Sequence, residues 1–310
     1  DESDGLDVII DVTGSDQPND PDLTAGTDSG FLNSDNITNS TSLSFTVSNL
    51  TATDSLVLLK DDVVVTSALI GSSTYTITTT SPVTGTYTVY SKDIAGNQSI
   101  ASDGLDVTVD QTAPIVSNVA IDLASGSDSG TKDDDNLTND YTPEFSVSNL
   151  VVADSVYLHV NDVFNQRLKA TSTTMSITTD SLAEGINVIS IFARDPAGNL
   201  SEVSDNTLTI SMDTRPPTMS TSAPDLLVAD DAGFDNTDNI TNNSSPRFEL
   251  IELPIVQDSI RLFYNTGTGD VLSKADSMSQ GITDTIQVGT PLGADTYLFT
   301  YVIIDSAGNF

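Results

Sequence analysis

The sequence lacks cysteine and tryptophan altogether, and it contains a single histidine, His159. Without cysteine the chain cannot form disulfides, thiolate zinc sites or a cysteine nucleophile. With only this histidine, nucleophilic triads are nearly excluded as well. No glycine-rich phosphate loop is present. These absences argue against most classes of catalyst.

Basic residues are also scarce, since ten Lys and Arg face 45 Asp and Glu and the formal net charge is −35. We expect no nucleic-acid partner, because binding nucleic acid needs a basic surface. We expect no membrane insertion either, because no apolar run approaches the roughly 20 residues that span a bilayer. No signal peptide and no initiating Met stand at the start, so we expect an excerpted or processed piece of a protein.

What the sequence does contain is two phrases that occur three times each, at a period of about 100 residues. The longer phrase, Asp-Leu-x4-Asp-Ser/Ala-Gly-x4-Asp-Asn-x-Thr-Asn, occupies residues 22–39, 122–139 and 225–242, with its first three Asp at offsets of 0, 6 and 13. The shorter phrase, Asp-x-Ala-Gly-Asn, starts at positions 93, 195 and 305. Self-similarity at this period predicts an array of small domains.

The segments between these phrases alternate apolar and polar residues, which is typical of β-strands, and long helical periods are missing. About seven short strands per ~100 residues indicate an antiparallel sandwich of the immunoglobulin-like kind, although the absence of Cys and Trp excludes the antibody type of core. The expected strands are 42–50, 142–150 and 245–253; 54–59, 154–160 and 258–264; 73–79, 173–179 and 283–288; strands starting near Gly85, Gly185 and Ala294; and 105–109 and 208–212.

We therefore predict an all-β chain of tandem immunoglobulin-like antiparallel β-sandwiches arranged end to end. Residues 12–110, 111–213 and 214–310 are assigned to domains 1, 2 and 3. Residues 1–11 match the last strand of a preceding domain, and domain 3 stops before its own last strand. Either the chain continues covalently, or the first strand of one molecule completes the last sandwich of the next, because unpaired strand edges invite such pairing.

The repeated acids predict cation sites where domains meet. If the first strand runs the length of each sandwich, the loop after it lies at the lower end. The linker, the loop after the second strand and the Ala-Gly-Asn turn then lie at the upper end. Stacking brings both groups together, although like charges about 4 Å apart repel by ~1–4 kcal/mol. Calcium fits best, since it accepts several oxygen ligands in loose geometry, with glycines 30, 130 and 233 letting the loop turn tightly.

The candidate metal ligands form four groups. The first junction combines Asp22, Asp28, Asp35 and Asn36 with Asp110, Asp154 and Asp195. The second combines Asp122, Asp128, Asp135 and Asn136 with Asp213, Asp258 and Asp305. Asp11, Asp54 and Asp93 await a preceding domain, whereas Asp225, Asp231, Asp238 and Asn239 await a following one. Any single copy could instead be an ordinary turn, and the first Asp of each long phrase could lie outside the ligand shell.

The phrases Asp-Ser-Gly-x4-Asp-Asn-Ile-Thr-Asn, Asp-Ile-Ala-Gly-Asn and Val-Asp-Gln-Thr-Ala-Pro (residues 109–114) resemble the tandem bacterial Ig-like domains of giant calcium-dependent surface adhesins, over essentially the whole chain. The resemblance implies secretion to the bacterial cell surface and calcium ions at domain junctions. It also implies a stalk whose partners are neighbouring repeats, with the ligand-binding tip elsewhere. The third domain departs from the pattern with Asp-Ala-Gly at 231–233.

Three rival functions remain. A glycosidase could use paired acids, but their threefold recurrence favours structure, and we interpret His159 as a surface or edge residue. A carbohydrate-binding module would need aromatic residues grouped on one exposed face, and most of the ten Phe and eight Tyr occupy core-like positions. A self-assembling surface filament or surface layer with strand exchange between subunits is the strongest alternative to the stalk.

Overall fold

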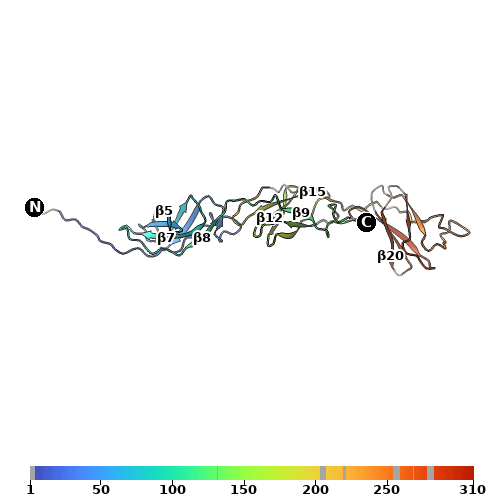
Figure 1. The fold of residues 1–310 in the computed structure, drawn as a ribbon, viewed down its shortest axis with the longest axis horizontal. Coiled ribbons are helices and arrows are strands. Elements are labelled where there is room, and N and C mark those ends of the chain that lie inside the picture. Colours follow the sequence, from blue (N-terminus) through green and yellow to red (C-terminus); the bar gives the residue numbers. More distant parts are fainter. Residues whose placement is uncertain are drawn as a thin grey trace.

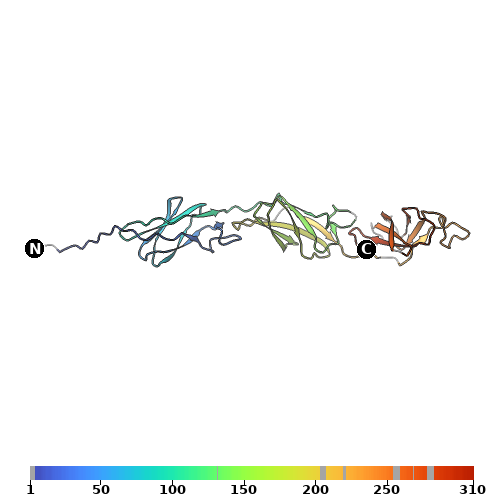
Figure 2. The ribbon, with the colours of Figure 1, turned by 90° about the horizontal axis from the view of Figure 1, so that it is seen from below.

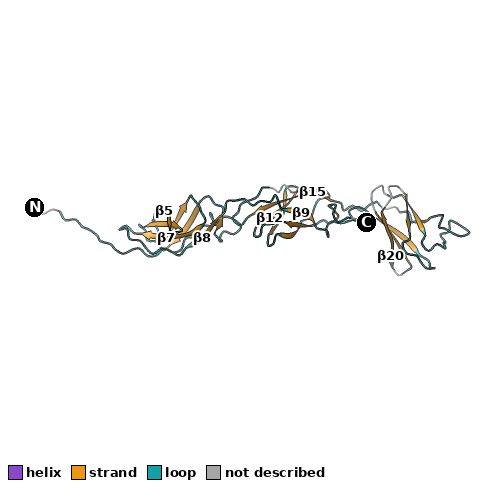
Figure 3. Cartoon of the chain, viewed as in Figure 1, coloured by secondary structure: helices purple, strands orange, loops and turns teal. Residues whose placement is uncertain are grey.

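The computed structural model describes residues 4–130, 132–202, 207–218, 221–253, 259–267, 269–277 and 283–310. Within these residues every regular element is a strand (Figure 3), so the predicted all-β class is confirmed. Three sandwiches follow one another along a rod in sequence order, from the blue end to the red end (Figures 1 and 2). Among the described residues, no helix has the length and apolar character that a membrane crossing requires.

Domain 1 packs a three-stranded sheet, β1-β3-β6, on a five-stranded sheet, β2-β8-β7-β4-β5. Only β2 and β8 run parallel. Alternate residues of β3, namely Leu43, Phe45 and Val47, are fully buried, as their period of two predicts. The bounds are β1 (Asp22–Leu23), β2 (Ile37–Thr38), β3 (Leu43–Ser48), β4 (Ser55–Lys60), β5 (Val63–Leu69), β6 (Thr74–Thr79), β7 (Gly85–Lys92) and β8 (Leu105–Val109).

Domain 2 repeats this topology with sheets β9-β11-β14 and β10-β16-β15-β12-β13. Its parallel pair is β10 with β16. The bounds are β9 (Ala120–Leu123), β10 (Leu137–Thr138), β11 (Glu144–Ser148), β12 (Ser155–Val160), β13 (Val163–Lys169), β14 (Thr174–Thr178), β15 (Gly185–Arg194) and β16 (Leu208–Met212).

Domain 3 has two three-stranded sheets, β17-β18-β21 and β20-β19-β22. In domains 1 and 2 the last strand, β8 or β16, pairs with β7 or β15. Within the described residues no strand pairs with the same edge of their counterpart, β22. Residues 240–241, the counterparts of β2 and β10, form no strand there, and Ile240 is exposed. The bounds are β17 (Asp225–Leu226), β18 (Arg247–Ile251), β19 (Ser259–Asn265), β20 (Asp270–Ser277), β21 (Thr283–Gln287) and β22 (Leu298–Ile304).

Each domain has its own hydrophobic core between its two sheets. Aromatic pairs mark two of these cores: Phe45 lies 4.8 Å from Tyr87 between ring centroids, and Phe248 lies 4.4 Å from Phe299. Because no core is shared, the relative orientation of the domains depends on the loops at their ends.

The structure corrects three strand expectations. The first strand does not run the length of the sandwich, since β9 covers only Ala120–Leu123 and residues 111–119 form no strand; Pro114 in that stretch has no N–H for a ladder. In domains 1 and 2 the first residues of the equivalent strands, β7 and β15, pair with the last strand of the domain. Within the described residues domain 3 has no such partner strand, so the strand expected near Ala294 begins only at Leu298. The hairpin strands β5, β13 and β20 were not expected at all.

Candidate cation sites at the domain junctions

The loop at the lower end of each domain holds a buried carboxylate at the same place, only 2–5 % exposed, and the loop of domain 3 also buries Asp230 at 7 %. One oxygen of the repeated carboxylate, Oδ2, accepts a hydrogen bond of 3.2 Å from a backbone N–H eight residues later. The other, Oδ1, is buried without a hydrogen-bond partner in all three copies. A buried carboxylate oxygen without a partner is unfavourable unless a positive charge satisfies it. The three residues are Asp28, Asp128 and Asp231.

An asparagine in the left-handed conformation donates each of these backbone hydrogen bonds. The φ angles of Asn36, Asn136 and Asn239 are 59°, 60° and 58°. Asparagine tolerates this region better than most residues, and the conformation turns its N–H towards the carboxylate. The recurring Asn of the long phrase therefore has a structural role in shaping the loop.

Burial raises the pKa of Asp28, and the negative charges of Asp35 and Asp22 raise it further. The pKa of Asp128 is raised in the same way by burial and then by Asp135 and Asp133. The hydrogen bonds from the asparagine N–H groups oppose these shifts only in part. Ionisation at both positions is thus less favourable than for an ordinary exposed aspartate.

The acids expected at the upper end of domain 2 do lie near one another. Burial raises the pKa of Asp154 to about 6, and the charges of Asp195 and Asp110 contribute to the shift. Asp154 and Asp195 are 5 % and 8 % exposed. In domain 1 the equivalent Asp54 is also buried and accepts a hydrogen bond from the Ser15 hydroxyl.

The Asp-x-Ala-Gly-Asn turn is held by its own asparagine, which the sequence interpretation did not single out. Asn199 Nδ2 donates to Asp195 Oδ2 at 2.8 Å and to the linker carbonyl of Asp110 at 2.9 Å. Asn309 makes the same two contacts with Asp305 and Asp213. The asparagine recurs as regularly as the aspartate, and that recurrence was the available signal.

The expected ligands differ in burial. Seven are buried: Asp28, Asp54, Asp128, Asp154, Asp195, Asp231 and Asp305. Six are half-buried: Asp35, Asn36, Asp93, Asp110, Asn136 and Asp213. Seven are exposed: Asp11, Asp22, Asp122, Asp135, Asp225, Asp238 and Asn239. Asp258 lies outside the described residues.

Lower and upper loops meet at both junctions. The Ser29 hydroxyl of domain 1 has two acceptors for its one proton, Asn39 Oδ1 at 2.6 Å and the Ala197 carbonyl of domain 2 at 3.0 Å, and Asn39 Nδ2 donates to Asn199 Oδ1 at 3.1 Å. At the second junction Ser129 Oγ donates to the Ala307 carbonyl at 2.6 Å. Across the part of the chain that the structure describes, no three acidic or histidine side chains stand together closely enough to hold a metal ion by themselves.

The donor chemistry nevertheless fits a hard cation. The charged groups that act on Asp28 and Asp128 are further carboxylates, and carboxylate oxygens are ligands that calcium prefers. Because three carboxylates do not converge, a complete coordination sphere at any one loop would also need backbone carbonyls, water or a shift of a half-buried acid such as Asp35. The fit therefore rests on Asp28 and its two counterparts.

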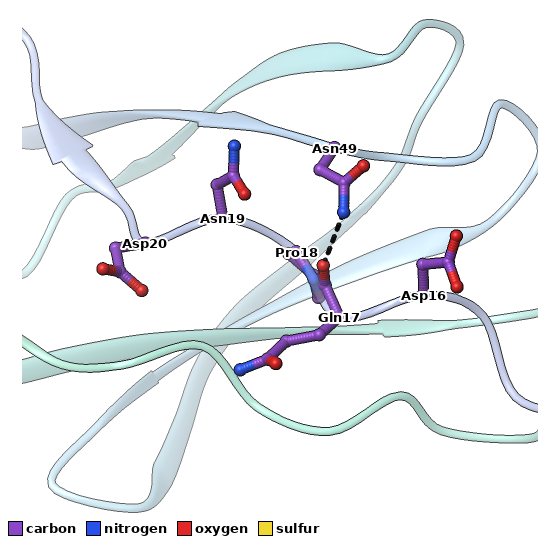
Figure 4. Close-up of a pocket in the computed structure, with 6 residues that line it drawn as sticks. All are labelled: Asp16, Gln17, Pro18, Asn19, Asp20 and Asn49. Carbon is purple, nitrogen blue, oxygen red and sulfur yellow. Dashed lines mark hydrogen bonds between the residues drawn. The ribbon is translucent and has the colours of Figure 1, made fainter.

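Two other features are structural. A hollow beside residues 16–20 is bordered by Asn49, whose Nδ2 donates to the Gln17 carbonyl at 2.8 Å (Figure 4). Asn149 makes the equivalent bond to Asn118 in domain 2, so this tie is part of the fold. His159 packs edge-on against Phe192 at 4.6 Å between ring centroids, and burial lowers its pKa. It lies half-buried in β12, between β13 and β15, so the expectation of a surface or edge residue is wrong.

Comparisons with known proteins agree with this architecture. The family model described as bacterial Ig-like domain matches residues 15–111, 115–214 and 218–310. A search of curated proteins found no match.

Similar solved structures include the FN1–FN3 domains of chicken CNTN1, at 12% identity and a TM-score of 0.36, covering 96% of this chain and 95% of that chain. Fibronectin(III)-like modules of Clostridium thermocellum CbhA align at 13% identity and a TM-score of 0.36, covering 58% and 90%. A tetra-tandem repeat from the extending region of a large adhesion protein aligns at 15% identity and a TM-score of 0.24, covering 94% and 71%. No functional conclusion follows at these values.

Proposed function

The chain belongs to the bacterial Ig-like domain family, and we propose that it is the extracellular stalk of a large bacterial surface adhesin or filament, stiffened by calcium at its domain junctions. Tandem domains of this family alone account for almost the whole length, and no catalytic domain was identified. The proposed partners are neighbouring repeats, and the group that contacts the adhesion target lies outside this segment.

The observation that carries this proposal is the buried, unpartnered Oδ1 atom that recurs at Asp28, Asp128 and Asp231. One such atom could be an accident of packing. The same atom at the same place in three domains indicates a ligand that all three share. In a chain with a net charge of −35, a divalent cation is the ligand that electrostatics favours.

Calcium, when bound, would supply positive charge that offsets repulsion among the carboxylates. At the first junction Asp28 and Asp35 of domain 1 would hold the ion from one side. At the upper end of domain 2, Asp154, which feels the charges of Asp195 and Asp110, would contribute ligands, and backbone carbonyls or water would complete the coordination. Because Ser29 and Ala197 place these two ends against each other, ions at either end would restrict movement at the junction.

Small-angle X-ray scattering tests the proposal. With excess calcium we expect a larger maximum dimension and radius of gyration than with a chelator, because unscreened carboxylates loosen the junctions when calcium is removed. Asp110→Asn with Asp195→Asn should reduce this difference by loosening the first junction only. Identical scattering curves with and without calcium would contradict the proposal.

Strand exchange between copies is a second candidate, favoured by a specific observation. Residues 4–12 extend away from domain 1 (Figure 1), with Leu6, Val8 and Ile10 each more than two-thirds exposed. The described part of domain 3 leaves one edge of β22 unpaired. Concentration-dependent head-to-tail oligomers that disappear when residues 1–11 are removed would support this candidate, whereas a monomer at all concentrations would contradict it.

A further inference from the structure

The loop that carries Asp28 and Asp128 ends in a Ser-Gly tip, and this tip contacts the next domain through neutral groups. Ser29 donates to Ala197 and Ser129 donates to Ala307. Both acceptors are backbone carbonyls in the Ala-Gly-Asn turn. Arg167 of domain 2 also lies over the ring of Phe31, with its guanidinium carbon 5.0 Å from the ring centroid. None of these contacts needs a divalent ion.

The glycine of the tip fits against the turn with no room for a side chain. A Cβ atom at Gly30 would lie 2.1 Å from the Pro196 carbonyl oxygen, and one at Gly130 would lie 1.9 Å from the Ser306 carbonyl oxygen. Gly198 of the turn also lies close to the tip, since its Cβ would lie 3.0 Å from the Cα of Gly30. Backbone meets backbone here, which fixes the distance between the loops tightly.

The three copies of the turn provide an internal comparison. Ala197 and Ala307, which face a docked tip, are both 1 % exposed. Ala95 occupies the same place in domain 1, where no tip is docked, and it is exposed. The difference in burial is therefore associated with the docked tip and not with the turn sequence.

The tip of domain 3 differs as well. Ala232 replaces the serine, so it has no hydroxyl to donate. Gly233 does not adopt the positive φ of Gly30 and Gly130, contrary to the expectation that all three glycines turn the loop alike. Phe234, the counterpart of Phe31, is fully exposed. The serine hydroxyl that reaches the next domain from domains 1 and 2 thus has no counterpart in domain 3.

We propose that the Ser-Gly tip and the Ala-Gly-Asn turn form a clasp that sets the angle between neighbouring domains without any cation, and that calcium adds stiffness to a junction already oriented. The clasp adds a second element to the proposed stalk. Only its biological purpose depends on the stalk function, and the contacts themselves do not. It predicts a rod that keeps a preferred bend at each clasped junction even in a chelator.

Spin labels can measure the clasp, because the chain has no native cysteine. Thr76, Ser176 and Thr285 are exposed and occupy equivalent strand positions in the three domains, so cysteines there report one distance for each junction. The test variant is Ala197→Gln, whose longer side chain blocks the tip at the first junction. Ala95→Gln is the matched control, because it changes the same turn where no tip docks.

Double electron–electron resonance should give a single distance between domains 1 and 2 in the wild type, with the same centre in calcium and in a chelator and a narrower distribution in calcium. Ala197→Gln should broaden that distribution in both conditions and leave the distance between domains 2 and 3 unchanged. Ala95→Gln should change neither. Ser29→Ala, which removes only the hydroxyl, should broaden the distribution less and cannot disturb the fold of domain 2.

The clasp is contradicted if wild type, Ala197→Gln and Ser29→Ala give the same distribution in a chelator. It is also contradicted if Ala95→Gln broadens the distribution as much as Ala197→Gln. Failure of the calcium proposal has a different signature, because the wild-type distribution would then be the same with and without calcium while the variants still differ from it.

Discussion

At the scale of single residues, the carboxyl group of Asp128 lies where its ionisation is disfavoured by burial and by its neighbours Asp135 and Asp133. Offsets in the sequence were enough to find this group, because turn residues alone have no reason to recur at fixed spacing three times. They could not separate the buried Asp128 from the exposed Asp122, because spacing does not report solvent exposure. The asparagine that holds the Ala-Gly-Asn turn was overlooked although it recurs in all three copies.

Asp128→Asn tests the cation role directly. The amide keeps an acceptor for the Asn136 N–H and removes the buried charge. In a chelator we expect domain 2 to melt at the same temperature as wild type or higher. Calcium should then stabilise the variant less, by about 2.7 kcal/mol per lost site at a calcium concentration 100-fold above Kd.

Differential scanning calorimetry measures both effects. Asp162→Asn is the control, since it removes one charge at a turn that tolerates asparagine and is not a proposed ligand. An Asp128→Asn variant that is less stable in the chelator and equally responsive to calcium would contradict the cation role.

Arg247 provides a second prediction at this scale. Its guanidinium pairs with Asp230 at 2.8 Å and holds the pKa of that carboxyl at about 2, below its usual value of 3.8. The stabilisation is therefore present above pH ~4 and is lost as the pH falls through about 2. Arg247→Ser, which introduces the residue found at position 44 in domain 1, should lower the melting temperature of domain 3 by a few degrees at pH 7.

This loss should shrink as the pH approaches 2, where Asp230 becomes protonated in the wild type too. Calorimetry at several pH values measures it, with Ser44→Ala in domain 1 as a substitution outside the pair. An Arg247→Ser effect that does not depend on pH would mean that the arginine acts through packing alone.

At the scale of elements, apolar alternation predicted the strands with buried faces, such as β3 and β11, because burial on one face imposes a period of two. It missed β5, whose residues are mostly exposed and carry no alternation. The Asp61-Asp62 pair before it was a usable signal in the sequence. Both residues have positive φ in the structure and form a two-residue hairpin turn. The first strand is short because proline has no N–H to donate to a neighbouring strand. The prediction of a strand along the whole length of the sandwich did not take this into account.

The short strands β2 and β10 join the acidic loop to the last strand of the same domain. Thr138 in β10 is fully buried, and its hydroxyl donates to the Ser127 carbonyl at 2.5 Å. Thr138→Val keeps the shape and deletes both this bond and the one that the hydroxyl accepts from the Asp140 N–H at 3.0 Å, so we expect domain 2 to lose about 1–3 kcal/mol of unfolding free energy. Denaturant unfolding measures the loss, with the exposed Thr178→Val expected to stay within about 0.5 kcal/mol of wild type. A Thr138→Val variant as stable as wild type would contradict a stabilising role for the hydroxyl.

At the scale of the whole molecule, the repeat period predicted a row of sandwiches, and the three domains do follow one another in line (Figure 2). The contacts that join them were beyond the sequence, because Ser29 and Ala197 are 168 positions apart and repetition within one domain does not specify how two domains meet. The same repetition places acidic loops at the domain ends, so negative charge is concentrated at the junctions between domains. Cations that relieve the charge would therefore stiffen the joints.

The most direct test of this account is the amount of calcium that the chain binds. Equilibrium dialysis against about 1 mM free calcium, the weak end of the range for extracellular modules, followed by elemental analysis gives that number. The account predicts several ions per chain and fewer when Asp28, Asp128 and Asp231 are all changed to Asn. A wild-type chain that retains no calcium under these conditions would contradict it.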